Sequence, residues 1–367
     1  PVGPGNDGKL FAAAMTPDGA MVAVGGWSAD NDVYLFDRSS GVLRHRITGL
    51  PDVVTQLTFS PDGRTLAVGL WGVNGVRLFS SDSGWNSSRE TGSDNRYEGA
   101  VSGARFSWDG TRLAVASTDG LIRSYAATQR SLSLAGSTRT TQGRQPFGVA
   151  WSPDNRLLAV GFSDSASVAV LNADSLQLAY APSTTGISGG SLNAVSWTRD
   201  GEDLLAAGTW RGADRLNLLR RWRQGGRGAT SDESVASNTV VGVHALTDGR
   251  VVYASAEPSW GWLKNTSNGY TNQSFGSALA DFRSARNAFR LSRDGTTVAF
   301  PLNRTRGTGE VTAFDVAQLQ WTAPLPQWKP PSAGRPPVVI SDWFENTTPT
   351  LNQRRISLHE SEISMTA

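Results

Sequence analysis

The sequence predicts an all-β fold: a seven-bladed β-propeller in which each blade is a four-stranded antiparallel sheet. A tight turn resembling Ser-Pro-Asp-Gly recurs seven times, and its aspartates lie 44, 47, 45, 46, 48 and 46 residues apart: Asp18, Asp62, Asp109, Asp154, Asp200, Asp248 and Asp294. Short apolar runs flank every copy, whereas no long window repeats apolar residues with a helical period. A period near 45 residues with four strands per unit is typical of propeller blades.

Each repeat has the same order of parts. An apolar strand such as VTQLTFS precedes the turn, and a small-residue strand such as LAVGLW follows it. A third strand such as VRLF and a fourth segment such as GVLRHRITG complete the unit. By this pattern the units span roughly residues 9–50, 51–98, 99–143, 144–188, 189–235, 236–278 and 279–323, which places the propeller within residues 1–323.

The composition changes after the last repeat. The stretch PLPQWKPPSAGRPP contains six prolines, which disfavour central strands and favour an extended connector, so residues 324–337 are predicted to form a linker. Residues 338–367 are too short for a domain and carry no turn motif of their own. We expect this tail to help close the ring or to begin a second propeller.

The overall composition excludes several classes of protein. The chain has no cysteine, which rules out disulfides and cysteine nucleophiles within it. No apolar run approaches the roughly 18 residues that a membrane span needs. The net charge is only +2 and no continuous basic tract occurs, so nucleic acid is not an expected ligand. We therefore expect a cytoplasmic protein without a membrane partner.

Several repeats resemble a known family. The units LTFSPDGRTLAVG and VAWSPDNRLLAVG resemble WD-repeat propellers. The chain is also similar to propellers found C-terminal to caspase-like peptidase domains in large bacterial proteins, through GPGNDGKLFAAAMTPDG, VYLFDRSSG, GLPDVVTQLTFSPDG, QPFGVAWSPD, AFRLSRDG and DWFENTTPTLN. The resemblance implies a non-catalytic, regulatory interaction or sensing propeller whose partner is a protein or peptide, such as an attached caspase-like peptidase domain.

The chain departs from that family in one respect. The Gly-His and Trp-Asp signatures of WD repeats are missing, and the third strands end at Asp37, Ser80 and Ala126 instead. The buried hydrogen-bond network that these signatures build in the family is therefore not expected, and the blades should depend more on apolar packing.

Catalytic residues are not apparent in the sequence. The three histidines, His45, His244 and His359, are far apart, and we interpret each as a structural residue. The alternative function is a propeller enzyme, a hydrolase or lactonase, acting on a small molecule in the central channel. A metal there would need carboxylates, but the seven predicted innermost strands contain no Asp or Glu; beyond Ser and Thr their polar residues are Gln56, Arg105, Asn193, His244, Asn287 and Arg290. We therefore predict no cofactor, no metal and no enzyme activity in this chain.

Tryptophans indicate a candidate binding face. Trp27, Trp71 and Trp210 end their second strands, and Trp260 lies near the same place in the irregular sixth repeat. We predict that these four gather opposite the Asp-Gly turns as a partner-binding rim, because tryptophan and arginine are enriched in interface hot spots. The alternative is that each packs as a wedge between blades. Arg211 and Arg215, in the arginine-rich hairpin after Trp210, are predicted to form a basic lip, with a solvated edge hairpin as the alternative.

Overall fold

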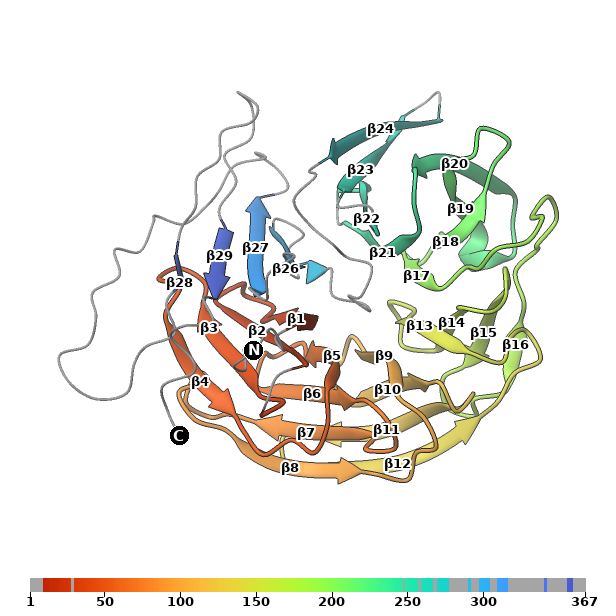
Figure 1. Ribbon diagram of the computed structural model, residues 1–367. Coiled ribbons are helices and arrows are strands. Elements are labelled where there is room, and N and C mark those ends of the chain that lie inside the picture. Colours follow the sequence, from red (N-terminus) through yellow and green to blue (C-terminus); the bar gives the residue numbers. More distant parts are fainter. Residues whose placement is uncertain are drawn as a thin grey trace.

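A computed structural model describes residues 9–27, 30–246, 248–256, 259–266, 269–276, 290–291, 297–303, 309–315, 340–341 and 355–358. These residues form seven antiparallel sheets arranged as a ring (Figure 1). The expected all-β propeller fold is therefore confirmed. Within the described part of the chain, the helical structure consists of one short 3-10 turn, η1 (Gln224–Gly226).

The sheets follow the sequence repeats one for one. In chain order the first three contain β1 (Lys9–Met15), β2 (Met21–Trp27), β3 (Val33–Asp37) and β4 (Leu43–Ile47); β5 (Val54–Phe59), β6 (Thr65–Leu70), β7 (Val76–Ser80) and β8 (Arg89–Asp94); and β9 (Val101–Phe106), β10 (Arg112–Ser117), β11 (Ile122–Thr128) and β12 (Ser131–Thr138). The next three contain β13 (Pro146–Trp151), β14 (Leu157–Phe162), β15 (Val168–Asn172) and β16 (Leu178–Tyr180); β17 (Ala194–Trp197), β18 (Leu204–Arg211), β19 (Asn217–Trp222) and β20 (Thr230–Ala236); and β21 (Val240–Ala245), β22 (Val251–Ser255), β23 (Ser259–Thr266) and β24 (Gly269–Gly276).

The seventh sheet differs from the expected four strands. It has the order β25 (Arg290–Leu291), β26 (Thr297–Asn303), β27 (Gly309–Asp315), β29 (Arg355–Leu358) and β28 (Ile340–Ser341). Its outer two strands come from residues 338–367, and β29 pairs antiparallel with β27. The first sheet is built entirely from the first repeat, so it takes no strand from this tail. The two sheets meet instead through β1, which packs against β25 and β26.

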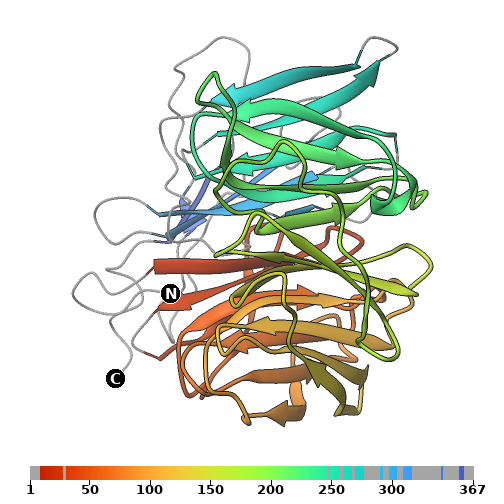
Figure 2. The ribbon, with the colours of Figure 1, turned by 90° about the vertical axis from the view of Figure 1, so that its right-hand side faces the viewer.

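The first strand of each repeat lies nearest the ring centre (Figure 1). Consecutive inner strands pack against one another, and Figure 2 shows many of the strands running along the axis of the ring. The Asp-Gly turns of the first six sheets follow the inner strands, so they lie on one face of the ring. The ends of the second strands lie on the other face.

The hydrophobic core lies between neighbouring sheets. Each cluster of buried residues spans two consecutive sheets, as with Leu57 and Leu70 of the second sheet beside Ala12 and Leu35 of the first. Small residues of the second strand permit this close approach. A Cβ atom on Gly69 would lie 2.5 Å from the Cγ1 atom of Val101 in the next sheet, which no real structure tolerates. The small-residue pattern LAVG therefore follows from blade-to-blade packing.

Candidate functional site

Five of the repeated turns are held by the same set of hydrogen bonds. In the second sheet, Ser60 Oγ donates to Asp62 Oδ1 at 2.5 Å, and the same carboxylate oxygen accepts from the backbone N–H of Arg64 at 3.0 Å. Ser60 Oγ also accepts from the N–H of Thr65 at 3.0 Å. Equivalent hydroxyl-to-aspartate bonds link Thr16 to Asp18, Ser107 to Asp109, Ser152 to Asp154 and Thr198 to Asp200. These aspartates are structural, as the sequence indicated.

The third sheet contains a buried polar network that the sequence analysis did not expect. Asp119 accepts hydrogen bonds from Arg123 Nη2 at 2.7 Å and from the backbone N–H of Leu121 at 2.9 Å. The side chains of Asp119 and Arg123 are only 1% and 5% exposed. Burial alone would raise the pKa of Asp119, but the hydrogen bonds from Arg123, Ser117 and Leu121 hold it below its usual value. The sequence STDGLIR, which repeats the Asp-Gly turn one strand later, was the available signal.

A second part of the same network joins two tyrosines to a carboxylate. The Arg123 guanidinium lies 3.8 Å from the centre of the Tyr97 ring. The hydroxyl of Tyr97 lies 2.8 Å from that of Tyr125, which donates to Asp94 Oδ2 at 3.0 Å. The third sheet is therefore stabilised by buried polar contacts in addition to apolar packing.

Trp27 and Trp71 are the exposed members of the predicted tryptophan rim. They lie at equivalent strand ends of the first and second sheets, and their side chains are 52% and 44% exposed. The nearby loop residue Val73 is 57% exposed. The loop is fixed by Asn74, whose side-chain amide donates to Asp52 at 2.9 Å. We refer to Trp27, Trp71 and Val73 as the tryptophan surface.

The other two tryptophans are placed differently. Trp210 is 3% exposed and packs in the core between the fourth and fifth sheets, with the Arg220 guanidinium 4.8 Å from its ring centre. Trp260 is 4% exposed and lies on the third strand, β23, opposite Ala254 of β22, not at the end of a second strand. Of the four tryptophans expected in the rim, two are therefore exposed and two, Trp210 and Trp260, are buried.

The arginine hairpin divides into an exposed tip and a paired base. Arg211 and Arg215 are exposed, and Arg211 Nε donates weakly to Asn217 Oδ1 at 3.3 Å. Arg220 forms a two-point ion pair with Asp232, with nitrogen-to-oxygen distances of 2.7 and 2.8 Å. Arg221 forms a buried ion pair with Asp203. The base of the hairpin is thus structural, and the two arginines of the tip are exposed.

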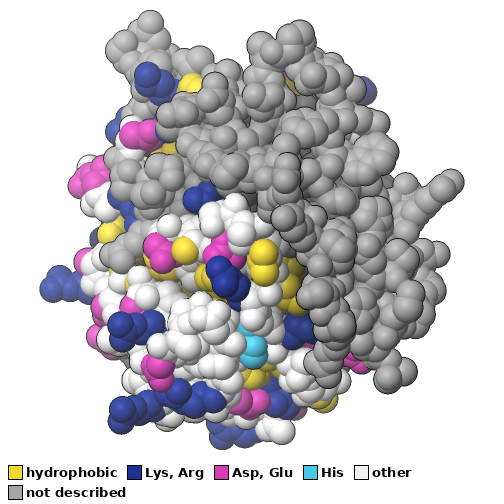
Figure 3. All heavy atoms as spheres, turned by 90° about the vertical axis from the view of Figure 1, so that its left-hand side faces the viewer, with side chains coloured by type: hydrophobic (Ala, Val, Ile, Leu, Met, Phe, Trp, Pro, Cys, Tyr) yellow, Lys and Arg dark blue, Asp and Glu magenta, His cyan; other side chains and the backbone are white. Residues whose placement is uncertain are grey.

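Three further features were sought among the described residues: a basic tract, a metal-binding group and a membrane-spanning helix. Over the described part of the face in Figure 3, basic and acidic side chains are interspersed and no continuous basic tract occurs. No group of three or more His, Asp or Glu side chains among the described residues is arranged to hold a metal. Within the same part of the chain, no helix has the length and apolarity that crossing a membrane requires.

The histidines are separated in the structure. The ring of His45 lies 2.8 Å from Ser88 Oγ, and burial lowers its pKa. His244 lies on the innermost strand β21 and faces the central channel. His359 lies outside the described residues. The two described histidines are therefore not brought together.

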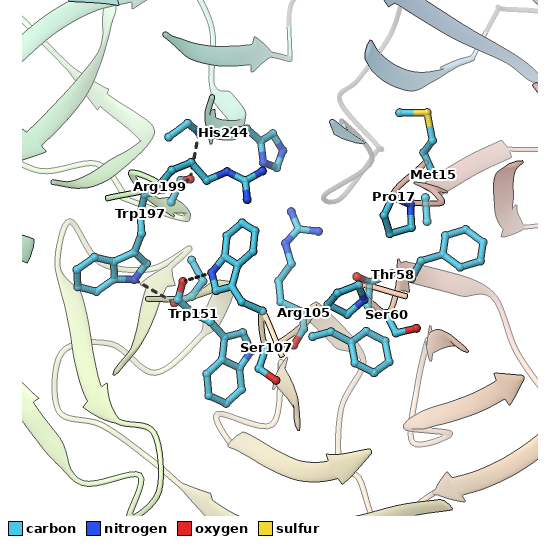
Figure 4. Close-up of a pocket in the computed structure, with 18 of the residues that line it drawn as sticks. Met15, Pro17, Thr58, Ser60, Arg105, Ser107, Trp151, Trp197, Arg199 and His244 are labelled. Atoms are coloured by element: carbon cyan, nitrogen blue, oxygen red, sulfur yellow. Dashed lines mark hydrogen bonds between the residues drawn. The ribbon is translucent and has the colours of Figure 1, made fainter. Parts of the chain in front are cut away.

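A pocket of about 220 Å³ occupies the channel mouth on the Asp-Gly turn face. Its walls come from the ends of the innermost strands and from the turns that follow them. They include aromatic residues of consecutive sheets, Phe59, Phe106, Trp108, Trp151 and Trp197. Figure 4 shows Arg105, Arg199 and His244 pointing into this pocket. None of the described lining residues is acidic.

The aromatic walls of the pocket are held rigidly. Trp151 Nε1 donates to the carbonyl oxygen of Arg105 at 3.0 Å, and Trp197 Nε1 donates to that of Ala150 at 3.2 Å. Each ring therefore bridges two consecutive inner strands. The Arg199 guanidinium, from the turn of the fifth sheet, lies 4.2 Å from the centre of the Trp108 ring in the turn of the third sheet. Such a preformed wall is typical of a ligand pocket.

The other polar residues predicted for the innermost strands serve different roles. Gln56 is fully buried, and its side-chain amide donates to the carbonyl oxygen of Ser102 at 2.9 Å. Asn193 is buried and accepts from Ser191 Oγ at 3.3 Å. Both therefore tie inner strands to neighbouring backbone or side chains. Asn287 and the side chain of Arg290 lie outside the described part of the chain.

Comparison with known proteins supports the fold. Residues 89–125 match the family model "WD domain, G-beta repeat". This segment runs from β8 through β11, so it combines the outer strand of the second sheet with the first three strands of the third. It also contains the Asp94, Tyr97, Asp119 and Tyr125 network. None of the curated proteins compared matches the chain.

Among solved structures, the chain is similar to a chain in a crystal structure of the mitotic checkpoint complex. The TM-score is 0.63 at 18% sequence identity, and the match covers 84% of this chain and 89% of that chain. At this identity the match shows the fold alone. The chain is a β-propeller that contains a segment similar to the WD domain, G-beta repeat.

Proposed function

We propose that this chain is a non-catalytic protein-interaction or sensing propeller that binds a protein or peptide partner through the tryptophan surface. The observation that carries the proposal is the exposure of Trp27 and Trp71 at equivalent strand ends of adjacent sheets. Exposed tryptophans are costly to leave in water and are enriched among interface hot spots. Arg211 and Arg215, at the exposed tip of the hairpin in the fifth sheet, would provide a separate basic site for an acidic part of the partner.

The resemblance to propellers that follow caspase-like peptidase domains suggests the biological setting. The propeller would act as a regulatory module of a bacterial caspase-like peptidase or a related signalling protein. Mass spectrometry of the native protein, enriched from source cells with an antibody to this chain, tests that setting. Peptides from a caspase-like domain in the same polypeptide are expected, and a native protein without them would contradict it.

Affinity capture tests the binding surface itself. The wild-type chain is compared with a Trp27→Ala/Trp71→Ala variant and with a Val42→Ala/Leu178→Ala control. Val42 and Leu178 are exposed apolar residues, at 52% and 47%, that lie away from the tryptophan surface. A partner retained by the wild type and the control but lost by the tryptophan variant supports the proposal. Identical capture by all three proteins would refute it.

A further inference from the structure

Among the described residues that line the pocket, Arg105 is a cation with no carboxylate beside it. Arg105 lies on β9, its side chain is partly exposed to the pocket, and Figure 4 shows its guanidinium extending toward the pocket centre. Its side chain makes no hydrogen bond or ion pair with any described residue. Loss of hydration lowers the pKa of Arg105 to about 10, so the group is still charged at neutral pH.

The three arginines that are buried among the described residues each pair with a carboxylate. Arg123 pairs with Asp119, Arg220 with Asp232 and Arg221 with Asp203. A charge removed from water without a partner is strongly unfavourable, which is why such pairs form. Arg105 departs from this rule in a pocket whose described walls carry no acidic residue. An anion from outside the chain would satisfy it.

The residues that line the pocket indicate which chemical class of anion would fit it. A single guanidinium offers two parallel N–H donors that fit the two oxygens of a carboxylate. Phe106 and Trp108 follow Arg105 in sequence and also line the pocket, so an apolar or aromatic group attached to the carboxylate would contact their rings. Arg199 and His244 add two further nitrogen-bearing groups that face the same space.

We propose that the pocket at the Asp-Gly turn face binds a carboxylate carried on an apolar or aromatic body, with Arg105 as the residue that holds the carboxylate. The carboxylate comes from a small organic acid, from a peptide C-terminus or from an acidic side chain of a peptide. The site lies on the face opposite the tryptophan surface, so it is separate from the partner-binding surface proposed above.

Calorimetric titration of the full chain with paired probes tests this site. The first pair is N-acetylphenylalanine and its C-terminal amide, which differ only in the carboxylate. The second pair is the blocked dipeptides Glu-Phe and Gln-Phe, which place the charge on a side chain. Inorganic phosphate is the third probe. We expect at least one acid to bind about tenfold or more tightly than its neutral counterpart, which corresponds to one charge-assisted contact.

The two acid probes distinguish the sources of the carboxylate. Preference within the first pair indicates a small acid or a peptide C-terminus, and preference within the second pair alone indicates an acidic side chain. Equal binding of acid and neutral probes, binding of phosphate alone, or no binding of any probe at millimolar concentration would each overturn the proposal.

Variants assign the binding to Arg105. Arg105→Gln is expected to abolish the preference for acids, and Arg144→Gln, at an exposed arginine that does not line the pocket, is expected to retain it. Thermal unfolding without ligand gives an independent readout, because removing an unmatched charge should raise the melting temperature of Arg105→Gln. An acid preference that survives in Arg105→Gln, or a fall in its melting temperature, would show that Arg105 is a structural residue.

Discussion

Trp27 and Trp210 occupy equivalent ends of second strands, yet Trp27 is 52% exposed and Trp210 is 3% exposed. The difference comes from the segment that precedes the inner strand of the fifth sheet. A Cβ atom on Gly190 in this segment would lie 2.6 Å from the Cα atom of Trp210, and Ile187 packs against the same cluster. One tryptophan therefore belongs to the core and the other to the surface.

The two positions should respond differently to truncation. Trp210→Ala is expected to lower the free energy of unfolding by about 3–5 kcal/mol, because it leaves a cavity between two sheets and removes the ring beneath Arg220. Trp27→Ala is expected to lower it by less than about 1 kcal/mol. Urea denaturation of both variants measures the difference. Equal losses would contradict the assigned environments.

The Asp119–Arg123 pair should contribute strongly to stability. Asp119→Asn leaves the Arg123 guanidinium buried without its counter-charge, so we expect a loss of about 3–5 kcal/mol. Asp174→Asn is the matched control: its carboxylate pairs with Arg112 but is 89% exposed, and the expected loss is less than about 1 kcal/mol. Chemical denaturation at neutral pH measures both. A small loss for Asp119→Asn would show that the network is dispensable.

Acidification should remove the contribution of Asp119 to the free energy of unfolding. Because its pKa in the folded state is lowered, its stabilisation is fully present above the unfolded pKa of about 3.9 and disappears as the pH falls through the folded value. The difference in unfolding free energy between wild type and Asp119→Asn should therefore narrow below about pH 4. Denaturation curves from pH 7 to pH 2 measure it. A difference that widens on acidification would contradict the lowered pKa.

The repeated turns should affect stability without affecting partner binding. Asp62→Ala removes the acceptor for Ser60 Oγ and for the N–H of Arg64, at an expected cost of about 1–2 kcal/mol. The turn lies on the face opposite Trp27 and Trp71, so capture of the partner should be unchanged. Lost capture by a folded Asp62→Ala variant would instead place the turn within the binding surface.

The tail strand β29 should protect the edge of β27. Deleting residues 338–367 leaves the backbone of β27 unpaired on one side, and unpaired strand edges favour association with other chains. We expect a lower melting temperature and concentration-dependent self-association, measured by thermal unfolding and size-exclusion chromatography. An unchanged melting temperature together with a monomeric elution profile would contradict a role of this strand in the seventh sheet.

Much of the architecture could be predicted because each repeat contains its own turn signal. The Asp-Gly turns located the inner strands, and the small residues after them indicated the close packing seen at Gly69. The exposure of the tryptophans could not be predicted in the same way. Whether the end of a second strand is covered depends on the loop that leads into the inner strand of the same sheet, and around Trp210 that loop does not follow the repeat.

The candidate site in the channel was only partly visible in the sequence. Arg105 and His244 were identified as polar residues of inner strands, but their common pocket depends on the curvature of the ring. Trp108 and Arg199 belong to turns of different repeats, and sequence alone gave no reason to place the guanidinium 4.2 Å from that ring. That no described carboxylate lies beside Arg105 depends on the folded arrangement of the inner strands, which the sequence does not give.

The binding affinity of the tryptophan surface tests the central claim most directly. The partner captured by the wild-type chain would be purified, and its dissociation constant measured against wild type, Trp27→Ala/Trp71→Ala and Val42→Ala/Leu178→Ala. We predict at least a 30-fold loss for the tryptophan variant, about 2 kcal/mol, and little change for the control. An unchanged dissociation constant for the tryptophan variant, or no partner captured by the wild type, would contradict the account.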